Sequence, residues 1–197
     1  MIITDPEILS KPCVPLNIKD MPDIIGKLEN ELAISGGIGL AANQIGYNVR
    51  ACVVSIPYKD GETIRYNRLF LANPVIIEAH APIISLEEEC LSFKGSRVKT
   101  VRWGEVVVKQ DKWAEDAPET MIFSSLTPSI TGNTGYSVIE TSCVQHELSH
   151  LFGLTIFDFK AYKVERNEPC PLHKDKKNKK CCNISHFNEN LFSIIGK

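Results

Sequence analysis

Two histidines four residues apart, His146 and His150, lie in the segment that most constrains how this chain can fold. Residues 138–153 place apolar side chains at the three- and four-residue spacing of an amphipathic helix, which Gly153 can end. Residues i and i+4 lie one turn apart on the same helix face, so both imidazoles can reach one metal ion. Glu147 follows the first histidine, where its carboxylate can accept a proton from water on that metal. The segment predicts a metal-binding helix; a helix with two surface histidines is the alternative.

A catalytic metal of this kind needs a third protein ligand and an open coordination position. Two classes of metalloprotease place that ligand downstream, but the position six residues after His150 is Ile156. Glu165 and Glu168 fit the spacing of the other class poorly. Upstream, Cys90 follows an acidic run, and a thiolate is a strong ligand for zinc or ferrous iron. Cys90 is therefore a candidate third ligand, although a cysteine on its own more often fills a small buried apolar position.

A third feature is the glycine-rich segment 37–44, which reads GIGLAANQ. Its small side chains allow the backbone to approach a ligand closely, and Gln44 offers a side-chain amide donor. The segment lacks the lysine and the serine or threonine of a phosphate-binding P-loop. It therefore predicts a ligand-contacting loop of another kind.

The remaining pattern indicates an α+β domain. Apolar spacing predicts a helix over 22–34. Short β-type runs predict strands over 49–56, 98–109 and 121–126, and over 69–78 with a break at Pro74. Strands clustered before a terminal helix indicate a mixed or antiparallel sheet. Residues 127–135 are rich in threonine, serine, glycine and proline, so we expect a flexible rim just before the metal helix.

Charge divides the chain near residue 165. The whole chain has 24 acidic and 22 basic residues, whereas residues 166–197 alone carry seven basic and three acidic ones. We predict a compact body over 1–165 and a basic, cysteine-bearing tail over 166–197. The net charge of −2 gives no general reason to bind nucleic acid.

The number of cysteines and the opening residues indicate a cytoplasmic protein. The seven cysteines are an odd number, and the opening MIITDPEILSKPC lacks the basic and apolar regions of a signal peptide. We expect reduced thiols rather than a disulfide framework, in a cytoplasmic protein. No run of about eighteen apolar residues is present, so no membrane span is expected.

Three segments in this order resemble the signature of the peptide deformylase family. The family carries GxGLAAxQ, EGCLS and QHExDH, and this chain reads GIGLAANQ, EECLS and QHELSH. The segments ITDPEIL, LFLANPVI and GLTIFDF also look like family segments, so the resemblance covers roughly residues 2–160. It implies a deformylase-like fold, with mixed or antiparallel sheets around a central metal-binding helix. It also implies hydrolysis of the N-formyl group from formyl-methionine at the N-terminus of nascent peptides, with release of formate.

The resemblance implies a role for each matching residue. The metal ligands are Cys90, His146 and His150. Glu147 transfers the proton, while the Gln44 side chain and the Leu91 backbone N–H stabilise negative charge on the formyl oxygen. The residues expected to bind the substrate are Ile38, Gly39, Leu86, Glu88, Ile139 and Cys143. The family favours ferrous iron in the cell, and Zn²⁺, Ni²⁺ or Co²⁺ also suits these ligands.

Three residues depart from the family pattern. Asn43 stands where proline or threonine is common, and we expect no harm from it. Glu89 replaces a glycine, which is costly only if that position needs an unusual backbone angle. Ser149 replaces an aspartate that helps to neutralise an arginine, here Arg102, which is short of a partner unless one of the glutamates 87–89 substitutes. These departures leave two alternatives open: a deformylase-like binding protein with impaired catalysis and, less favoured, a metalloprotease.

The tail resembles the small zinc-binding tail at the C-terminus of SecA proteins. Its candidate ligands for a closed structural zinc site are Cys170, His173, Cys181 and Cys182. The second cysteine of that motif is replaced by Leu172, so His173, or else His186, would have to supply the ligand. A solvated lysine run with incidental cysteines is the alternative. If the tail folds around zinc, its lysines suit contact with ribosomal RNA.

Overall fold

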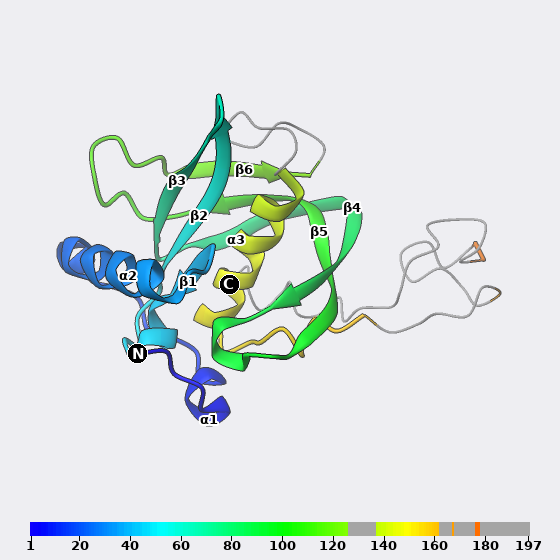
Figure 1. Cartoon of the computed structure of the whole chain (residues 1–197), viewed down its shortest axis with the longest axis horizontal. Helices are drawn as coiled ribbons and strands as arrows, with labels where there is room; N and C mark the ends of the chain where they lie inside the picture. Colours follow the sequence, from blue (N-terminus) through cyan, green and yellow to red (C-terminus); the bar gives the residue numbers. More distant parts are fainter. Residues whose placement is uncertain (126–136, 162–166, 168–175, 178–197) are drawn as a thin grey trace.

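Two antiparallel sheets surround one helix in the computed structural model, which describes residues 1–125, 137–161, 167, 176 and 177 (Figure 1). The first sheet has the order β1 (Gly39–Ala41), β2 (Ala51–Asp60), β3 (Thr63–Ala72). The second has the order β4 (Val75–Glu89), β5 (Arg97–Lys109), β6 (Thr120–Ser124). Helix α3 (Ser137–Leu151) lies between them and ends two residues before Gly153. The α+β class, the antiparallel sheets and the central helix are confirmed.

A second long helix, α2 (Met21–Ser35), covers the first sheet, as the apolar spacing predicted. Its residues Ile24, Leu28 and Leu32 pack in one cluster with residues of β1 and β2. Gly36 ends the helix because it adopts a left-handed φ of 71°, a conformation that side chains other than glycine resist. The remaining helical elements are α1 (Pro6–Leu9), η1 (Ile18–Asp20), η2 (Ala42–Ile45) and η3 (Leu91–Phe93).

The strands differ from the sequence prediction at one important place. The predicted break at Pro74 within 69–78 is confirmed, because β3 ends at Ala72 and β4 begins at Val75, but both strands are longer than predicted. Asn73, with a φ of 50°, lies at the bend between the two strands and is followed by Pro74. Beyond this turn β4 continues to Glu89, so it delivers the acidic run directly to Cys90.

Helix α3 is buried on almost all sides, which is why its polar side chains must be satisfied internally. Its residues Val144 and Leu148 pack with Val106 and Val108 of β5 in the main core. Gln145 accepts from the Trp103 N–H at 3.0 Å and donates to the Trp103 carbonyl at 2.8 Å. This side-chain amide joins α3 to β5 and so fixes the position of the two histidines along the strand.

Other predictions can be compared with the described residues. The cysteines in this part of the chain, at positions 13, 52, 90 and 143, are all free thiols, as expected. Within the same part, no helix combines the length and apolarity needed to span a membrane. The predicted rim over 127–135 and the four candidate zinc ligands of the tail lie outside the described residues.

Candidate active site

Cys90, His146 and His150 form one buried cluster of metal-ligating side chains. One ligand atom from each lies within 4.8 Å of the others, and Cys90 Sγ is 3.3 Å from His150 Nε2. The two imidazole centroids are 5.1 Å apart on successive turns of α3. Cys90 follows the last residue of β4, so the register of that strand places the third donor opposite the helix. A thiol and two imidazoles at this separation fit a first-row divalent metal.

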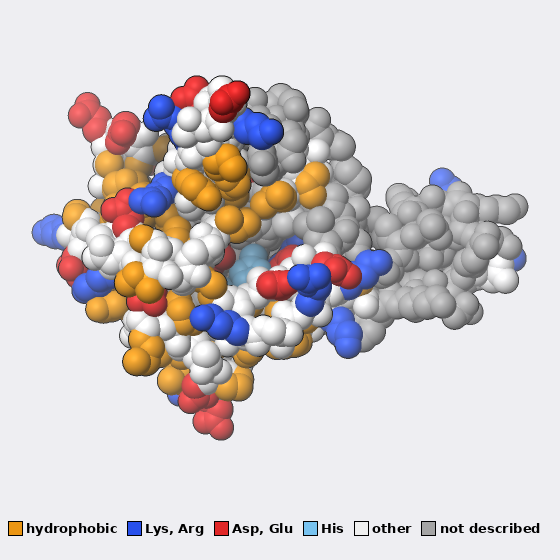
Figure 2. All heavy atoms as spheres, in the orientation of Figure 1, with side chains coloured by type: hydrophobic (Ala, Val, Ile, Leu, Met, Phe, Trp, Pro, Cys, Tyr) orange, Lys and Arg blue, Asp and Glu red, His pale blue; other side chains and the backbone are white. Residues whose placement is uncertain are grey.

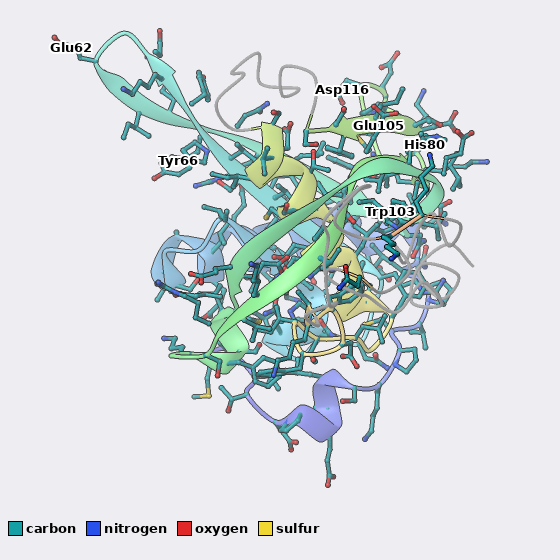
Figure 3. All side chains as sticks on the ribbon, turned by 90° about the vertical axis from the view of Figure 1, so that its right-hand side faces the viewer. Glu62, Tyr66, His80, Trp103, Glu105 and Asp116 are labelled. Atoms are coloured by element: carbon teal, nitrogen blue, oxygen red, sulfur yellow. The ribbon has the colours of Figure 1, made fainter. Side chains whose placement is uncertain are left out.

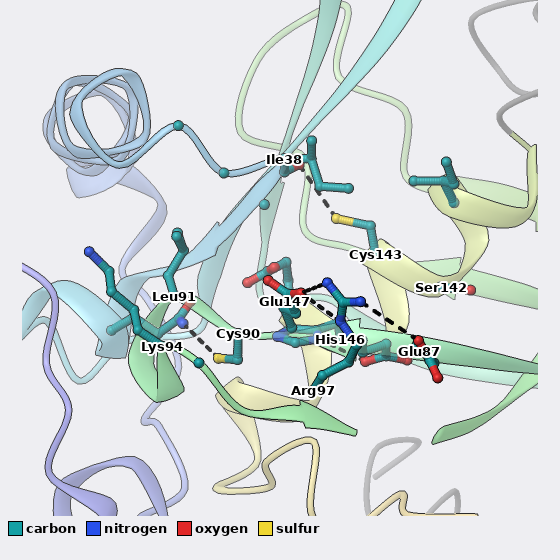
Figure 4. Close-up of a pocket in the computed structure, with 18 residues that line it drawn as sticks. Ile38, Glu87, Cys90, Leu91, Lys94, Arg97, Ser142, Cys143, His146 and Glu147 are labelled. Atoms are coloured by element: carbon teal, nitrogen blue, oxygen red, sulfur yellow. Dashed lines mark hydrogen bonds and ion pairs between the residues drawn. The ribbon is translucent and has the colours of Figure 1, made fainter. Parts of the chain in front are cut away.

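The cluster opens into a pocket of about 780 Å³ (Figure 4). The space-filling view shows histidine atoms, in pale blue, within a hollow on this face of the molecule (Figure 2). The sequence-predicted residues that line this pocket are Ile38, Gly39, Gln44, Glu88, Cys90, Leu91, Ile139, Cys143, His146 and Glu147. Leu86 lies on β4 opposite Thr100, and its side chain is outside the described part. His150 is buried and does not line the pocket; it contacts the pocket residue Cys90.

Glu88 is the partner that Arg102 was predicted to need. Its carboxylate accepts from Arg102 Nε and Nη2, both at 2.8 Å, and from the Thr100 hydroxyl at 2.6 Å. Its Oε2 also lies 2.8 Å from His146 Nδ1, so it orients a predicted metal ligand. Although burial would raise the pKa of Glu88, Arg102 and His146 hold it well below its ordinary value.

Two of the three departures from the family pattern, Ser149 and Glu89, are accommodated in this region. Ser149 accepts a hydrogen bond from Arg102 Nη1 at 3.1 Å and donates to the Gln145 carbonyl. Arg102 is further covered by the Phe159 ring, whose centroid is 3.9 Å from the guanidinium carbon. Glu89 needs no left-handed backbone, because Asn73 is the only non-glycine residue with a positive φ in the described part of the chain.

Glu147 points into the pocket against Gly39. A Cβ at residue 39 would lie 2.3 Å from Glu147 Oε1, so only glycine leaves room for this carboxylate. Glu147 Oε2 is buried and has no hydrogen-bond partner among the described residues. Burial raises the pKa of Glu147 to about 7, with His146 opposing the rise and Glu88 adding to it. A carboxylate in this condition is suited to exchanging a proton near neutral pH.

The glycine-rich segment brings Gln44 to the cluster. The Gln44 amide nitrogen lies 3.1 Å from Ser92 Oγ and 3.5 Å from Cys90 Sγ, while its Oε1 accepts from the Ala41 N–H. Asn43 donates to the His150 carbonyl at 2.7 Å and thereby ties this segment to the end of α3. The departure at residue 43 therefore has a contact of its own.

The two histidines differ in their electrostatic environment. Burial would lower the pKa of His146, but its bonds with Cys90 and Glu88 raise it to about 10. Burial, and then the nearby His146, lower the pKa of His150 well below its ordinary value. Burial thus favours the neutral form of His150, whereas the contacts of His146 favour its protonated form.

Several residues that matter here were not assigned a role from the sequence. They are Thr100, Gln145 and Phe159, which support the buried network, and Lys94 and Arg97, which line the pocket. The sequence could have indicated the role of Thr100. It lies between Val98 and Arg102 at alternate positions of β5, and all three side chains are buried. An arginine on such a face requires a buried acidic partner.

The chain is similar to known proteins over most of its length. The family profile described as polypeptide deformylase matches residues 1–166. A peptide deformylase of Aquifex aeolicus (strain VF5) is 31% identical over 162 residues, which cover 80% of this chain and 85% of the relative. A solved peptide deformylase from Plasmodium falciparum gives a TM-score of 0.64 at 25% identity and covers 81% of this chain and 86% of its own. A Met-Ala-Ser-bound class I type b peptide deformylase from Acinetobacter baumannii gives 0.65 at 21% identity, with coverages of 81% and 96%.

Proposed function

Because this chain belongs to the peptide deformylase family, we propose that Cys90, His146 and His150 hold its catalytic metal and that Glu147 transfers the proton. The reaction is hydrolysis of the N-formyl group of formyl-methionine at the N-terminus of nascent peptides, which releases formate. One observation carries the residue assignment. A buried Cys/His/His donor set lies at one pocket together with a Glu147 carboxylate oxygen that has no hydrogen-bond partner among the described residues.

The donor set also supports a proposal for the metal. A divalent ion held by these residues would acidify water and polarise the formyl carbonyl. One thiolate and two imidazoles suit Fe²⁺, Zn²⁺, Ni²⁺ or Co²⁺, and we propose iron in the cell. Replacing Cys90 with serine removes the thiolate at nearly constant volume, so elemental analysis of Cys90→Ser should show loss of metal from a folded protein. Full metal occupancy in this variant would remove Cys90 from the ligand set.

The protein's own groups divide the remaining work. Glu147 accepts a proton from the attacking water and returns it to the departing amine nitrogen. The Gln44 amide and the Leu91 backbone N–H donate to the formyl oxygen as it gains negative charge. The methionine side chain lies among Ile38, Ile139 and Cys143, and the backbone at Gly39 and Glu88 pairs with the peptide as an added strand.

The peptide-bound relative supports this use of the pocket, because the Acinetobacter baumannii enzyme of the same fold holds Met-Ala-Ser. Formate release from formyl-Met-Ala-Ser is therefore the direct test of function. Glu147→Gln should lower kcat about 10²- to 10⁴-fold at unchanged metal content, because an amide cannot accept the proton. Peptide binding without formate release in the metal-loaded protein would favour a binding role, and cleavage of an internal peptide bond would indicate a protease.

The protease alternative is disfavoured by a specific contact. Ile156, which stands where one protease class has its third histidine, is buried in one cluster with Cys90 and Val98. The position downstream of the helix is thus apolar core, and the third donor comes from β4 instead.

We also propose that residues 1–165 are the catalytic unit and 166–197 an appended tail, since the family profile ends at residue 166. The proposed structural zinc ligands of the tail are Cys170, His173, Cys181 and Cys182. Its lysines would contact the ribosome in the cytoplasm, where nascent chains emerge. The intact protein should bind one more zinc than a version ending at residue 165 and should sediment with ribosomes more strongly. Equal zinc content in the two would reject the zinc site.

A further inference from the structure

The hairpin of β2 and β3 projects from the body of the protein and leaves one strand edge open (Figure 1). β3 is the outer strand of its sheet, and its residues 63–68 are all exposed, whereas Leu71 and Ala72 at its inner end are buried. Glu62 lies at the tip of the hairpin, and Tyr66 lies between the tip and the body (Figure 3). An open strand edge offers unpaired N–H and C=O groups with which another strand can pair.

The backbone hydrogen bonds show which residues of β3 turn toward the open edge. The Ser55 N–H of β2 donates to the Ile38 carbonyl, on the side away from β3. Arg68 lies opposite Ser55, so the N–H and C=O of Arg68 also point away from the β2–β3 pairing. Backbone direction alternates along a strand, so Ile64 and Tyr66 point the same way. These three residues have no outward backbone partner among the described residues.

The inner end of the same edge is occupied. The Ala72 carbonyl accepts from the Asp111 N–H, and the Ala72 N–H donates to the Gln110 side chain. These bonds agree with the outward direction at Arg68, which is an even number of residues away. The edge is therefore open to another strand only along residues 62–68.

We propose that this edge pairs with the same edge of a second copy of the chain, so that two three-stranded sheets join into one antiparallel sheet. The two-fold axis passes at Arg65. Ile64 then lies opposite Tyr66 of the second copy, and Glu62 lies opposite Arg68; symmetry repeats each contact. Ile64 and Tyr66 are 57% and 56% exposed in a single copy, so the first contact covers apolar surface.

The side chains select this register from those that the backbone allows. Only residues of even number present outward groups, so the axis can lie at residue 64, 65 or 66. An axis at 64 would place Ile64 opposite itself and Glu62 opposite Tyr66. An axis at 66 would place Ile64 opposite Arg68. Only the axis at Arg65 joins an apolar side chain to an apolar one and an acid to a base.

Charges near the axis are compatible with this pairing. The two Arg65 side chains face each other, but Asp60 Oδ2 lies 2.7 Å from Arg65 Nε in each copy and compensates the charge. Arg68 is 3.4 Å from Glu29 of α2, and its side chain is 41% exposed, so it can accept a second carboxylate. The turn of the second hairpin ends beside Arg68, short of the occupied inner end.

The full chain, with a monomer mass of 22.0 kDa, should associate reversibly toward twice that mass in sedimentation equilibrium. Charge reversal tests the register. Glu62→Arg sets arginine against Arg68 at both ends of the interface, and Arg68→Glu sets glutamate against Glu62. Each variant alone should raise the dimer dissociation constant about tenfold. An equimolar mixture of the two should restore association, because every contact then joins one arginine and one glutamate.

The matched control is Glu7→Arg, a charge reversal on α1 at the other end of the molecule, which should leave the dissociation constant unchanged (Figure 1). Tyr66→Pro tests the backbone contact. The Tyr66 N–H points to the open edge, so proline removes a donor that only the second copy uses. This variant should stay monomeric and keep the far-ultraviolet circular dichroism of wild type.

Three outcomes would overturn the inference. The first is a wild-type chain that remains monomeric up to about 1 mM, a concentration at which even a small interface associates. The second is a mixture of the two charge variants that associates no better than either alone. The third is a dimer that neither the charge variants nor Tyr66→Pro weakens, since the contact would then lie elsewhere.

Discussion

Two glutamate–arginine pairs lie at the end of β4 and differ mainly in their exposure to water. Glu88 and Arg102 are buried, with side chains 9% and 0% exposed, whereas Glu89 and Arg97 are more than half exposed. The glutamates are neighbours in sequence but face opposite sides of the strand. We call Glu88 and Arg102 the inner pair. Because buried charged groups need hydrogen-bond partners, this pair also bonds to Thr100, Ser149 and His146. Glu89 and Arg97, which we call the outer pair, are solvated, so their ion pair contributes little to stability.

The largest expected effect comes from breaking the inner pair. Glu88→Gln leaves the buried Arg102 guanidinium without a compensating charge, and we expect the free energy of unfolding to fall by about 3–5 kcal/mol. Denaturant unfolding of the metal-free protein measures this loss. Glu89→Gln, the same substitution one residue later, is the matched control and should cost less than about 1 kcal/mol. Similar losses in the two variants would show that burial does not distinguish the pairs.

The stability that Glu88 contributes should also depend on pH. The pKa of Glu88 is well below its ordinary value of 4.5 in the folded protein, so its carboxylate stabilises the fold fully above that pH. As pH falls below about 4.5, the unfolded chain takes up the proton first, and stability falls by about 1.4 kcal/mol per pH unit. The stability gap between wild type and Glu88→Gln should therefore narrow below pH 4.5 in metal-free protein. A gap that stays constant down to pH 3 would contradict the assignment.

The inner pair also shows what the sequence could and could not predict. The spacing of His146 and His150 was enough to predict that they lie together, because a single helix fixes the relative position of both side chains. Cys90 was found through its motif, but its placement depends on β4, which was predicted to be short. Residues 78–89 read EAHAPIISLEEE, which lacks a regular apolar alternation and contains a proline, so this part of the strand is recognised only by its pairing with β5.

Three successive glutamates pose a different problem. Because side chains alternate along a strand, Glu88 must face opposite to Glu87 and Glu89. The alternation does not tell which of the two faces is buried. The sequence therefore left the partner of Arg102 open among the three. Only the register of β4 against β5, with Glu88 opposite Val98 and Glu89 opposite Arg97, decides it.

A smaller effect is expected from removing the hydroxyl that replaces the family aspartate. Ser149→Ala deprives Arg102 Nη1 of its acceptor, which should cost about 1–3 kcal/mol because the donor is buried. Ser142→Ala on the same helix is the control, since that hydroxyl bonds only to the Val138 carbonyl among the described residues and should cost less. Equal losses in both variants would mean that Ser149 contributes nothing specific to the inner pair.

The smallest effect should come from restoring the family glycine at position 89. If the backbone there were strained, Glu89→Gly would stabilise the protein; but no positive φ occurs at Glu89, so there is no strain to relieve. Glycine in a strand instead adds freedom to the unfolded chain, and we expect a loss of roughly 0.5–1 kcal/mol, while Glu89→Gln loses only the exposed ion pair. At 1 M salt the Glu89→Gln loss should vanish and the Glu89→Gly loss should persist, because screening removes charge effects but not backbone entropy. A gain in unfolding free energy for Glu89→Gly would place strain at the outer pair and would undo the contrast between the two pairs.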